Sequence, residues 1–294
     1  MIPDPQSISA SEYISFPTKI TFCSKGKILV LDRPWVMGIL NVTPDSFFEK
    51  SRVQNSNEGF LKVSERMISD GADILDIGGY SSRPMAEDIS IEEELKRTIS
   101  TIEKIKNNFP ETLISIDTFR SKVAVESVNA GADFVNDISA GELDPAMIPC
   151  VGKLNVPYIA MHMKGNPRTM VGETGYKDLL LEISNYFSQK INTCKKAGIK
   201  DVLIDPGFGF AKTLKQNYWI LKNLAYFKTI QAPIMVGISR KSMIQKILNV
   251  PADDTLNGTT ALNMTALING ANILRVHDVK EAKEAIKLYK EIYP

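Results

Sequence analysis

The feature that most restricts the fold of this chain is a short motif that joins a glycine to a β-strand and recurs along the sequence. Three near copies are Gly71-Ala72-Asp73-Ile74-Leu75, Gly131-Ala132-Asp133-Phe134-Val135 and Gly270-Ala271-Asn272-Ile273-Leu274. A looser copy runs from Ala197-Gly198 to Val202-Leu203. A glycine in this position commonly ends a helix, and here a strand follows within a few residues. The repeat therefore predicts a chain of successive helix–strand units.

Eight short apolar runs fit the strands of such units. The predicted strands are Val36–Leu40, Ile74–Ile77, Leu113–Ile116, Phe134–Val135, Tyr158–Met161, Val202–Ile204, Ile234–Val236 and Ile273–Val276. Several of them are apolar throughout rather than alternating, as buried parallel strands are. Eight repeated units predict an α/β fold, a single (β/α)8 TIM barrel, for which roughly 250 residues are typical.

The segments between the strands have helical periodicity. Ser90–Glu93 has the pattern of a capping box, and apolar residues follow it at three- and four-residue steps from Ile91 to Ile105. In the helical segment Tyr176–Ala197, Cys194 shares one face with Phe187, which predicts a core thiol rather than a reactive one.

The residues before the first barrel strand are predicted to form a leader and a β-hairpin. Thr18–Cys23 and Ile28–Leu31 are strand-like runs around a polar turn. We expect residues 1–34 to cover the bottom of the barrel as part of the same domain, and residues 35–294 to form the barrel. No linker rich in Pro, Gly or Ser divides the chain.

Composition excludes several classes of protein. With 44% hydrophobic and 23% charged residues, the chain is neither disordered nor a disulfide-rich miniprotein. Its 35 basic and 34 acidic residues argue against a nucleic-acid coat or a membrane-surface protein. The first residues lack the pattern of a signal peptide, no apolar run could span a membrane, and Cys23, Cys150 and Cys194 are scattered. We therefore expect a cytoplasmic protein with no nucleic-acid or membrane partner.

Polar side chains follow every predicted barrel strand at its C-terminal end, where such barrels carry their active sites. These residues are Asn41, Asp76, Asp117, Asn136, Asp137, His162, Asp205, Ser239, Arg240, Lys241, Arg275 and His277. A single polar residue at a strand end is usually a cap, but eight strands that end this way predict a site. The loops after the last two strands often bind phosphate, and here they carry arginine, lysine and histidine.

The acidic strand ends suggest the other half of a ligand. Asp117, Asn136 and Asp205 combine carboxylates with an amide, which suits the donor and acceptor edge of a nitrogen heterocycle. The alternative is that Asp117 and Asp205 are helix caps or turn residues. Phe210 is expected near the pocket floor, where it would stack on a flat ring, whereas Phe208 fits the core. Lys241 could instead serve as a Schiff-base lysine.

Two loops are longer than a minimal connection from strand to helix. Residues 41–48 follow the first barrel strand and residues 78–85 the second, and both contain Gly, Pro or Ser. Such loops are typical of mobile lids.

Together these residues resemble the dihydropteroate synthase family over nearly the whole chain, from about Ile20 to His277. The matching motifs are Met37-Gly38-Ile39-Leu40-Asn41-Val42-Thr43-Pro44-Asp45-Ser46-Phe47, Ser115-Ile116-Asp117-Thr118, Asn136-Asp137, Met161-His162-Met163, Asp205-Pro206-Gly207-Phe208-Gly209-Phe210, Ser239-Arg240-Lys241-Ser242 and Arg275-Val276-His277. The chain departs from the family in the second loop, where Tyr80, Ser82 and Met85 replace the common Glu, Thr and Gly. Ser82 keeps a hydroxyl, whereas Tyr80 and Met85 would alter the shape of the lid and the fit of inhibitors.

The resemblance implies a transferase of folate biosynthesis and a target of sulfonamides. The family joins 6-hydroxymethyl-7,8-dihydropterin pyrophosphate to p-aminobenzoate in an SN1-like reaction assisted by Mg²⁺, and it is usually a homodimer. The implied catalytic residues are Asp117, Lys241 and Arg275, and the implied metal contact is Asn41. The implied pterin and pyrophosphate contacts are Ser82, Arg83, Asp117, Asn136, Met163, Asp205, Phe210, Lys241, Arg275 and His277. The implied aminobenzoate and loop residues are Phe47, Pro84 and Ser239.

Two other functions share many of these features. A pterin-binding methyltransferase domain would have the same barrel and pterin carboxylates, but it would not need Arg275-Val276-His277 for pyrophosphate. A catalytically silent paralogue would bind pterins without turnover, and we expect it to have lost a polar strand-end residue. None of those residues is missing here.

Overall fold

The computed structural model describes residues 19–42, 57–80, 88–165 and 172–293. Eight parallel strands are arranged in the order β8-β7-β6-β5-β4-β3-β10-β9. They are β3 (Trp35–Asn41), β4 (Ile74–Gly78), β5 (Leu113–Asp117), β6 (Phe134–Asp137), β7 (Tyr158–Met161), β8 (Val202–Asp205), β9 (Met235–Val236) and β10 (Ile273–Val276). A parallel bridge between Ile204 and Ile234 joins the two ends of this sheet. The predicted (β/α)8 barrel is confirmed.

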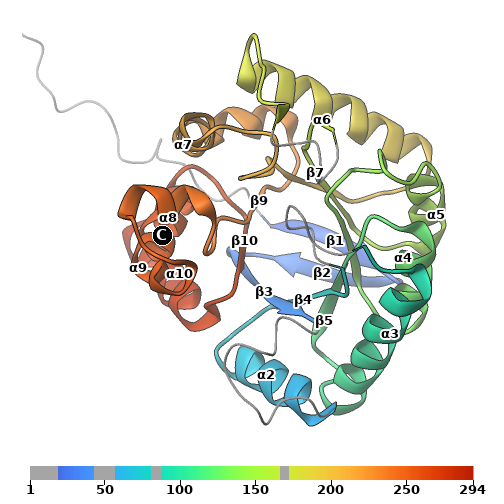
Figure 1. The fold of residues 1–294 in the computed structure, drawn as a ribbon. Coiled ribbons are helices and arrows are strands. Elements are labelled where there is room, and N and C mark those ends of the chain that lie inside the picture. The colour runs from blue at the N-terminus through green and yellow to red at the C-terminus, as the bar shows by residue number, and fades with distance from the viewer. Residues whose placement is uncertain (1–18, 43–56, 81–87, 166–171, 294) are drawn as a thin grey trace, which may run out of the picture.

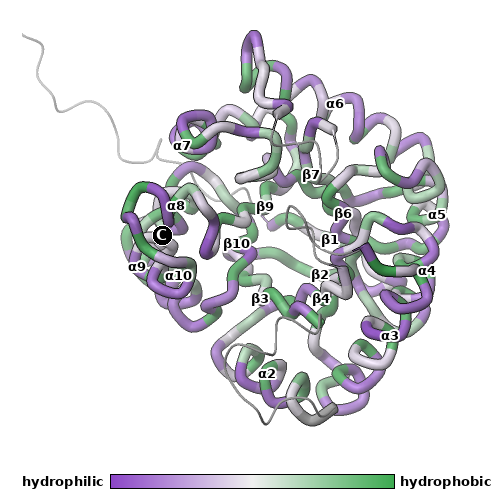
Figure 2. The backbone as a smooth tube through the Cα atoms, viewed as in Figure 1, coloured by the Kyte–Doolittle hydropathy of each residue, from purple (hydrophilic) through white to green (hydrophobic). Residues whose placement is uncertain are grey.

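Helices surround the strands as an outer ring (Figure 1). They are α2 (Asn57–Ser69), α3 (Ile91–Asn108), α4 (Ser121–Asn129), α5 (Met147–Leu154), α6 (Leu179–Lys196), α7 (Leu214–Lys222), α8 (Ser242–Leu248), α9 (Leu256–Ile268) and α10 (Val279–Ile292), with short 3-10 helices η4 (Leu224–Ile230) and η5 (Ala252–Asp254). The strands are mostly apolar, while hydrophilic residues recur along the helices of the outer ring (Figure 2). Within the described residues, no helix is both long and apolar enough to cross a membrane.

The third residue of the repeated motif explains why the motif recurs. The carboxylates of Asp73 and Asp133 accept hydrogen bonds from the backbone N–H of Val36 (2.8 Å) and Ile114 (3.0 Å). The amide oxygen of Asn272 accepts one from the N–H of Ile234 in the same way (2.8 Å). Each motif therefore ties the start of its own strand to the start of a neighbouring strand.

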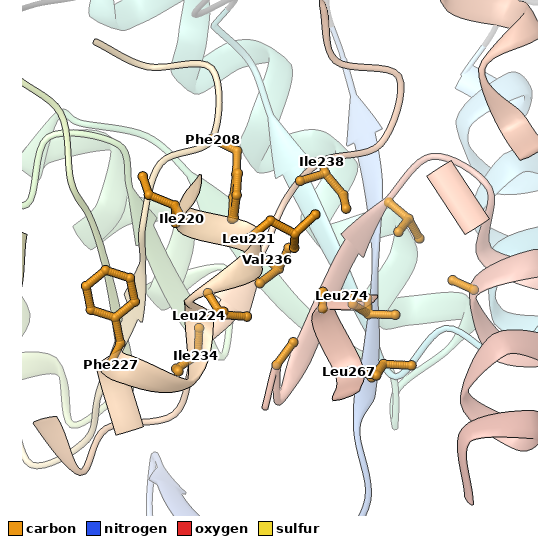
Figure 3. Packing of buried hydrophobic residues seen from close by; sticks show 14 of the residues in the cluster. Phe208, Ile220, Leu221, Leu224, Phe227, Ile234, Val236, Ile238, Leu267 and Leu274 are labelled. Carbon is orange, nitrogen blue, oxygen red and sulfur yellow. The ribbon is translucent and has the colours of Figure 1, made fainter. Parts of the chain in front are cut away.

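Most of the core lies between the strands and the ring of helices. One large cluster joins β8, β9 and β10 to α6, α7, α9 and α10 (Figure 3). Phe208 is part of this cluster and is fully buried, as predicted. Cys194 is also fully buried, and burial raises the pKa of its thiol to about 12, so it is a core thiol as expected.

An antiparallel hairpin of β1 (Ile20–Ser24) and β2 (Lys27–Leu31) covers the bottom of the barrel. The Phe22 ring packs edge-on against Trp35 and Phe134 at the N-terminal ends of β3 and β6, with 5.9 Å between the ring centroids in each pair. Ser24 Oγ donates to the carbonyl of Asp133 (2.9 Å). The predicted hairpin and its position are confirmed.

The expected capping box at the start of α3 is only half formed. Ser90 Oγ accepts from the N–H of Glu93 (3.1 Å), as predicted. The carboxylate of Glu93, however, accepts from Arg97 Nε one turn later (2.8 Å). A complete capping box occurs at the start of α7, where Thr213 and Gln216 bond to each other's backbone N–H groups. A competing arginine four residues on explains the difference, because an ion pair at this spacing draws Glu93 along the helix.

Candidate active site

Side chains alternate between the two faces of each strand. Inside the barrel, an apolar layer near the N-terminal ends of the strands, here called the floor, is followed by a polar layer nearer the C-terminal ends. Ile74, Phe134, Leu203 and Ile273 belong to the floor. Two residues further along the same strands are Asp76, Asn136, Asp205 and Arg275. Residues two apart point to the same face of a strand, and the later residues lie nearer the C-terminal mouth. The barrel therefore brings together four of the polar strand-end residues named from the sequence.

Arg275 is held by two carboxylates, Asp76 from β4 and Asp117 from β5. Its Nε donates to Asp76 Oδ2 and its Nη2 donates to Asp117 Oδ2, both at 2.6 Å. Burial opposes the charge of Arg275, but the attraction of Asp76 and Asp117 outweighs burial and raises the pKa of the guanidinium. Arg275 therefore remains a cation in the middle of the site.

Asp117 ends β5, with a side chain that is 20% exposed. Burial raises the pKa of this carboxyl to about 7, Arg275 acts against the rise, and Asp76, Glu94 and Asp137 add to it. A Cβ placed on Gly78 would lie 3.3 Å from Asn41 Oδ1 and 3.9 Å from Asp117 Oδ2. Glycine at this position thus allows the ends of β3 and β5 to approach one another.

Asn136 and Asp205 complete the acidic side of the layer, and both are almost fully buried. Asn136 Nδ2 donates to Asp76 Oδ2 (3.0 Å). Asp205 Oδ1 accepts from the N–H of Gly207 (2.8 Å), so the turn suggested by the sequence is present. Burial raises the pKa of Asp205, and the charge of Lys241 acts against the rise. Asp205 is therefore both a turn residue and a carboxyl group facing the site.

Lys241 follows β9 and lies beside the loop after β8. Its Nζ donates to the carbonyl of Phe208 and lies 4.9 Å from the centroid of the Phe210 ring. A Cβ on Gly237 would meet both Lys241 Nζ (4.0 Å) and Arg275 Cδ (3.9 Å), so the two cations flank this glycine. Burial lowers the pKa of Lys241 to about 8, while Asp205 acts to raise it.

Ser239 and His277 form a pair at the ends of the last two barrel units. Ser239 Oγ lies 3.0 Å from His277 Nδ1 and also accepts from the backbone N–H of His277 (3.2 Å). Arg240 differs from the expectation, because it forms ion pairs with Asp278 (2.6 Å) and Asp253 (3.0 Å) beside η5 and α10. These pairs hold its guanidinium beside η5 and α10, so Ser239 and Lys241 are the better candidates for anion contact in the loop after β9.

Met163 and Phe210 belong to a small apolar cluster with Met161, Ile138 and Ala211. This cluster provides an apolar wall beside Lys241, where a flat ring could pack. Asn41 is half-buried at the end of β3. The remaining predicted contacts, Phe47, Ser82, Arg83 and Pro84, lie outside the described residues, as does Met85.

Two polar strand-end residues are engaged in holding the scaffold. The Asp137 carboxylate accepts from Ser139, Gly141 and the Tyr158 hydroxyl. His162 Nδ1 lies 3.1 Å from Lys212 Nζ, and burial together with that lysine lowers the pKa of the imidazole to about 2. The histidine is therefore neutral and can accept a hydrogen bond from Lys212.

Sequence reasoning missed several residues that shape the site. Lys212 is buried, with Nζ donating to the carbonyls of Gly207 (3.0 Å) and Phe210 (2.9 Å), which ties the loop after β8 together. Glu94 is buried beside the end of β5, where it accepts from Thr118 (2.7 Å) and Arg120 (2.9 Å). No local pattern marks these residues, because a helix or loop lysine or glutamate is usually solvated. The sequence indicates Asp76 only as a polar strand-end residue and gives it no role.

The described residues contain no group of three or more His, Cys, Asp or Glu side chains placed to hold a metal ion. Mg²⁺ usually keeps several waters and binds through substrate phosphates together with one or two protein oxygens. The amide oxygen of Asn41 is a donor of this type.

Comparisons with known proteins agree with this geometry. The model of a family described as pterin binding enzyme matches residues 37–277. A dihydropteroate synthase from Escherichia coli is 44% identical over 267 residues, which cover 90% of this chain and 94% of the relative. The Yersinia pestis dihydropteroate synthase solved with a sulfonamide drug superposes with a TM-score of 0.87 at 40% identity, covering 93% of this chain and 99% of that one. The Xanthomonas albilineans dihydropteroate synthase solved with 4-aminobenzoic acid gives a TM-score of 0.85 at 35% identity, covering 93% and 98%.

Proposed function

Because this chain belongs to the pterin-binding enzyme family, and within it to the dihydropteroate synthases, we propose the following use of its site. The enzyme is a transferase of folate biosynthesis. It joins 6-hydroxymethyl-7,8-dihydropterin pyrophosphate to p-aminobenzoate and releases 7,8-dihydropteroate and pyrophosphate. The observation that carries the assignment of roles is the buried polar layer in which Arg275 bridges carboxylates of two other strands.

The pterin ring lies against the acidic side of the layer. Asp117, Asn136 and Asp205 offer acceptors to ring N–H groups, and the second amide hydrogen of Asn136 and the ammonium of Lys241 offer donors to ring nitrogen and oxygen atoms. Met163 and Phe210 supply apolar surface beside the ring. The planar guanidinium of Arg275 stacks across its face, which a lysine in this position could not do.

The pyrophosphate leaves toward the last strands. Arg275 and His277 face the leaving group together with Asn41, and we expect Ser82 and Arg83 to join them from the second loop. Bond cleavage places the electron pair of the C–O bond on pyrophosphate and a positive charge on the methylene carbon and the conjugated pterin ring. Cationic side chains stabilise the leaving anion, and the Asp117 carboxylate stabilises the developing cation.

The aminobenzoate nitrogen then forms the new C–N bond and releases one proton. No covalent bond to the enzyme is needed, so Lys241 binds ligands as an ammonium rather than forming a Schiff base. Ser239, Phe47 and Pro84 are the expected contacts of this second substrate. Sulfonamides, which share the arylamine of p-aminobenzoate, would compete for the same place.

Mg²⁺ would be held by Asn41 and by the pyrophosphate itself. When bound, it supplies positive charge that neutralises the leaving group. The donor chemistry fits this use, since a neutral amide oxygen leaves the anionic ligands to come from the substrate.

We also propose a homodimer in the cytoplasm. Exposed apolar side chains recur on the three late helices, at Ile247 and Leu248 of α8, Leu256 of α9, and Leu288 and Ile292 of α10. Several exposed apolar side chains on neighbouring helices are typical of an interface. The cysteines Cys23, Cys150 and Cys194 are all free thiols, in keeping with a reducing compartment.

The decisive experiment is a coupled assay of pyrophosphate release, run with both substrates, with each substrate alone, and with EDTA in place of Mg²⁺. We expect release only when both substrates and Mg²⁺ are present. Pterin binding without release would indicate a silent paralogue. Methyl transfer from a methylated pterin, with no pyrophosphate release, would indicate the methyltransferase alternative.

A further inference from the structure

Asp76 belongs to the same polar layer as the proposed ligand contacts Asn136, Asp205 and Arg275. Its side chain on β4 is fully buried. One oxygen, Oδ2, accepts from Arg275 Nε (2.6 Å) and from Asn136 Nδ2 (3.0 Å), so a single atom joins β4, β6 and β10. Both of its partners are proposed pterin contacts, whereas Asp76 itself is fully buried and is not among them.

The contact with Arg275 fixes the plane of the guanidinium. Nε and Nη2 lie on the same edge of this planar group, and that edge is bound by Asp76 and Asp117. Two short charge-assisted bonds on one edge leave little freedom to rotate. The opposite edge at Nη1 and the flat faces point away from these two bonds, so they remain for a ligand.

The contact with Asn136 fixes which way its amide points. A carboxylate only accepts hydrogen bonds, so the NH₂ group of Asn136 must face Asp76. The amide oxygen then lies on the other side, as an acceptor for a ligand N–H. Without the carboxylate, both orientations of the amide would become accessible, and one of them would present a donor where the pterin also presents a donor.

The second oxygen of Asp76, Oδ1, is buried and has no hydrogen-bond partner among the described residues. A buried polar atom in this state costs stability. Such a residue is better explained by what it orients than by what it adds to folding.

We propose that Asp76 is a positioning residue of the pterin site, a buried anion that sets the plane of Arg275 and the donor–acceptor sense of Asn136 without touching substrate. This inference rests on the proposed function. It adds a residue that acts through two others rather than on the ligand.

Asp76 also acts on Asp117. Its charge raises the pKa of Asp117, whereas Arg275 acts to lower it. Replacing Asp76 by asparagine removes the repulsion and leaves Arg275 to pair with Asp117 alone, and both effects lower the pKa of Asp117. The other acidic groups that face Asp117 are Glu94 from α3 and Asp137 from β6, and the replacement leaves both in place.

The test compares Asp76→Asn with Ser115→Ala by steady-state kinetics as a function of pH. Ser115 is the register partner of Asp76 on β5 and is fully buried, so the control perturbs the same layer at a residue outside the proposed contacts. For Asp76→Asn we expect kcat/KM for the dihydropterin pyrophosphate to fall roughly tenfold or more, and the acidic limb of its pH profile to move to lower pH. Ser115→Ala should have the same kcat/KM as the native enzyme and the same acidic limb in its pH profile.

A double variant separates positioning from general damage. Because Asp76 acts in part through Arg275, Asp76→Asn combined with Arg275→Lys should lower kcat/KM by clearly less than the product of the two single losses. A lower rate with an unmoved acidic limb, or losses that multiply in the double variant, would overturn the proposal.

Titration with 6-hydroxymethyl-7,8-dihydropterin tests the same inference without turnover. We expect weaker binding to Asp76→Asn and to a second variant, Asp76→Ser, with near-native melting temperatures of the ligand-free proteins. Equal pterin affinity in the native protein and in whichever of these variants folds would refute the positioning role. Because this arm needs no product, absence of turnover in the native enzyme would refute the proposed function and leave the positioning role to be judged by the titration.

Discussion

Replacing Asp117 by asparagine should stabilise the ligand-free enzyme while slowing its reaction. The carboxylate of Asp117 stands in a buried site where its pKa is about 7 instead of 3.8. Asparagine has nearly the same shape and carries no charge, so it resembles the protonated carboxyl. The two proteins therefore differ chiefly in one negative charge, and burial of this charge lowers the free energy of unfolding of the native protein.

The size of the effect follows from the pKa. A rise of about three pKa units corresponds to about 4 kcal/mol, at about 1.4 kcal/mol per unit. We expect a gain of about 2–4 kcal/mol in the free energy of unfolding, because Arg275 loses one of its two carboxylate partners in the variant. At roughly 2–4 °C for each kcal/mol, the melting temperature should rise by several degrees.

The difference in stability between the native enzyme and the variant depends on pH. A carboxyl whose pKa is raised in the folded state stabilises the protein fully only below the unfolded pKa, and this stability is lost as pH rises toward the folded pKa. Native enzyme and variant should therefore be nearly equal in stability near pH 4. The difference should grow between pH 4 and about pH 7, and stay constant at higher pH.

Although the Asp117→Asn variant should be more stable, its turnover should be lower. An amide can still bond to the pterin ring but cannot neutralise a developing cation, so turnover should fall more than pterin affinity. We expect kcat to fall roughly ten- to a hundredfold. The native enzyme should lose activity below about pH 7 as Asp117 takes up a proton, and the variant should lack that limb.

The assay pairs thermal unfolding with steady-state kinetics from pH 4 to pH 9. Asp144→Asn provides a matched control, because backbone bonds from Ser121 and Ala146 lower the pKa of Asp144 against the effect of burial. Replacing the Asp144 carboxylate by an amide should therefore decrease the stability of the protein above pH 4 rather than increase it. An Asp117→Asn enzyme that is less stable at pH 8, or whose turnover and pterin affinity fall by the same factor, would refute this account.

Three further predictions concern the cations and the loops. Lys241→Ala should weaken both pterin and p-aminobenzoate binding by roughly 1.5–3 kcal/mol, the loss of one charge-assisted hydrogen bond; unchanged affinities in calorimetric titrations would contradict its placement. Arg275→Lys should be poorly tolerated because lysine lacks the planar fork, whereas native kcat/KM in that variant would show that charge alone suffices. We expect p-aminobenzoate to bind about a hundredfold more tightly once a dihydropterin, pyrophosphate and Mg²⁺ occupy the site, if loop closure costs about 3 kcal/mol; equal affinities with and without them would mean preformed loops.

The sequence alone determined the architecture, because the signals for a parallel barrel are local. The apolar run Tyr158–Met161 became a strand with the predicted bounds, since an apolar run without charges is typical of a parallel strand buried on both faces. The glycines of the repeat marked helix ends, and the acidic or amide residue two positions later turned out to bond to the neighbouring strand. The capping box at Ser90 failed in part because Arg97, one turn away, attracts the glutamate.

The sequence also placed the polar strand ends at the barrel mouth, but it could not say what each of them contacts. Asp76 and Arg275 are 199 positions apart, and only closure of the barrel brings them to 2.6 Å. Arg240, which adjoins Lys241, pairs instead with Asp278 on the outer ring. Partner choice and pKa depend on burial and on charges from other strands, and these are properties of the folded chain rather than of any local pattern.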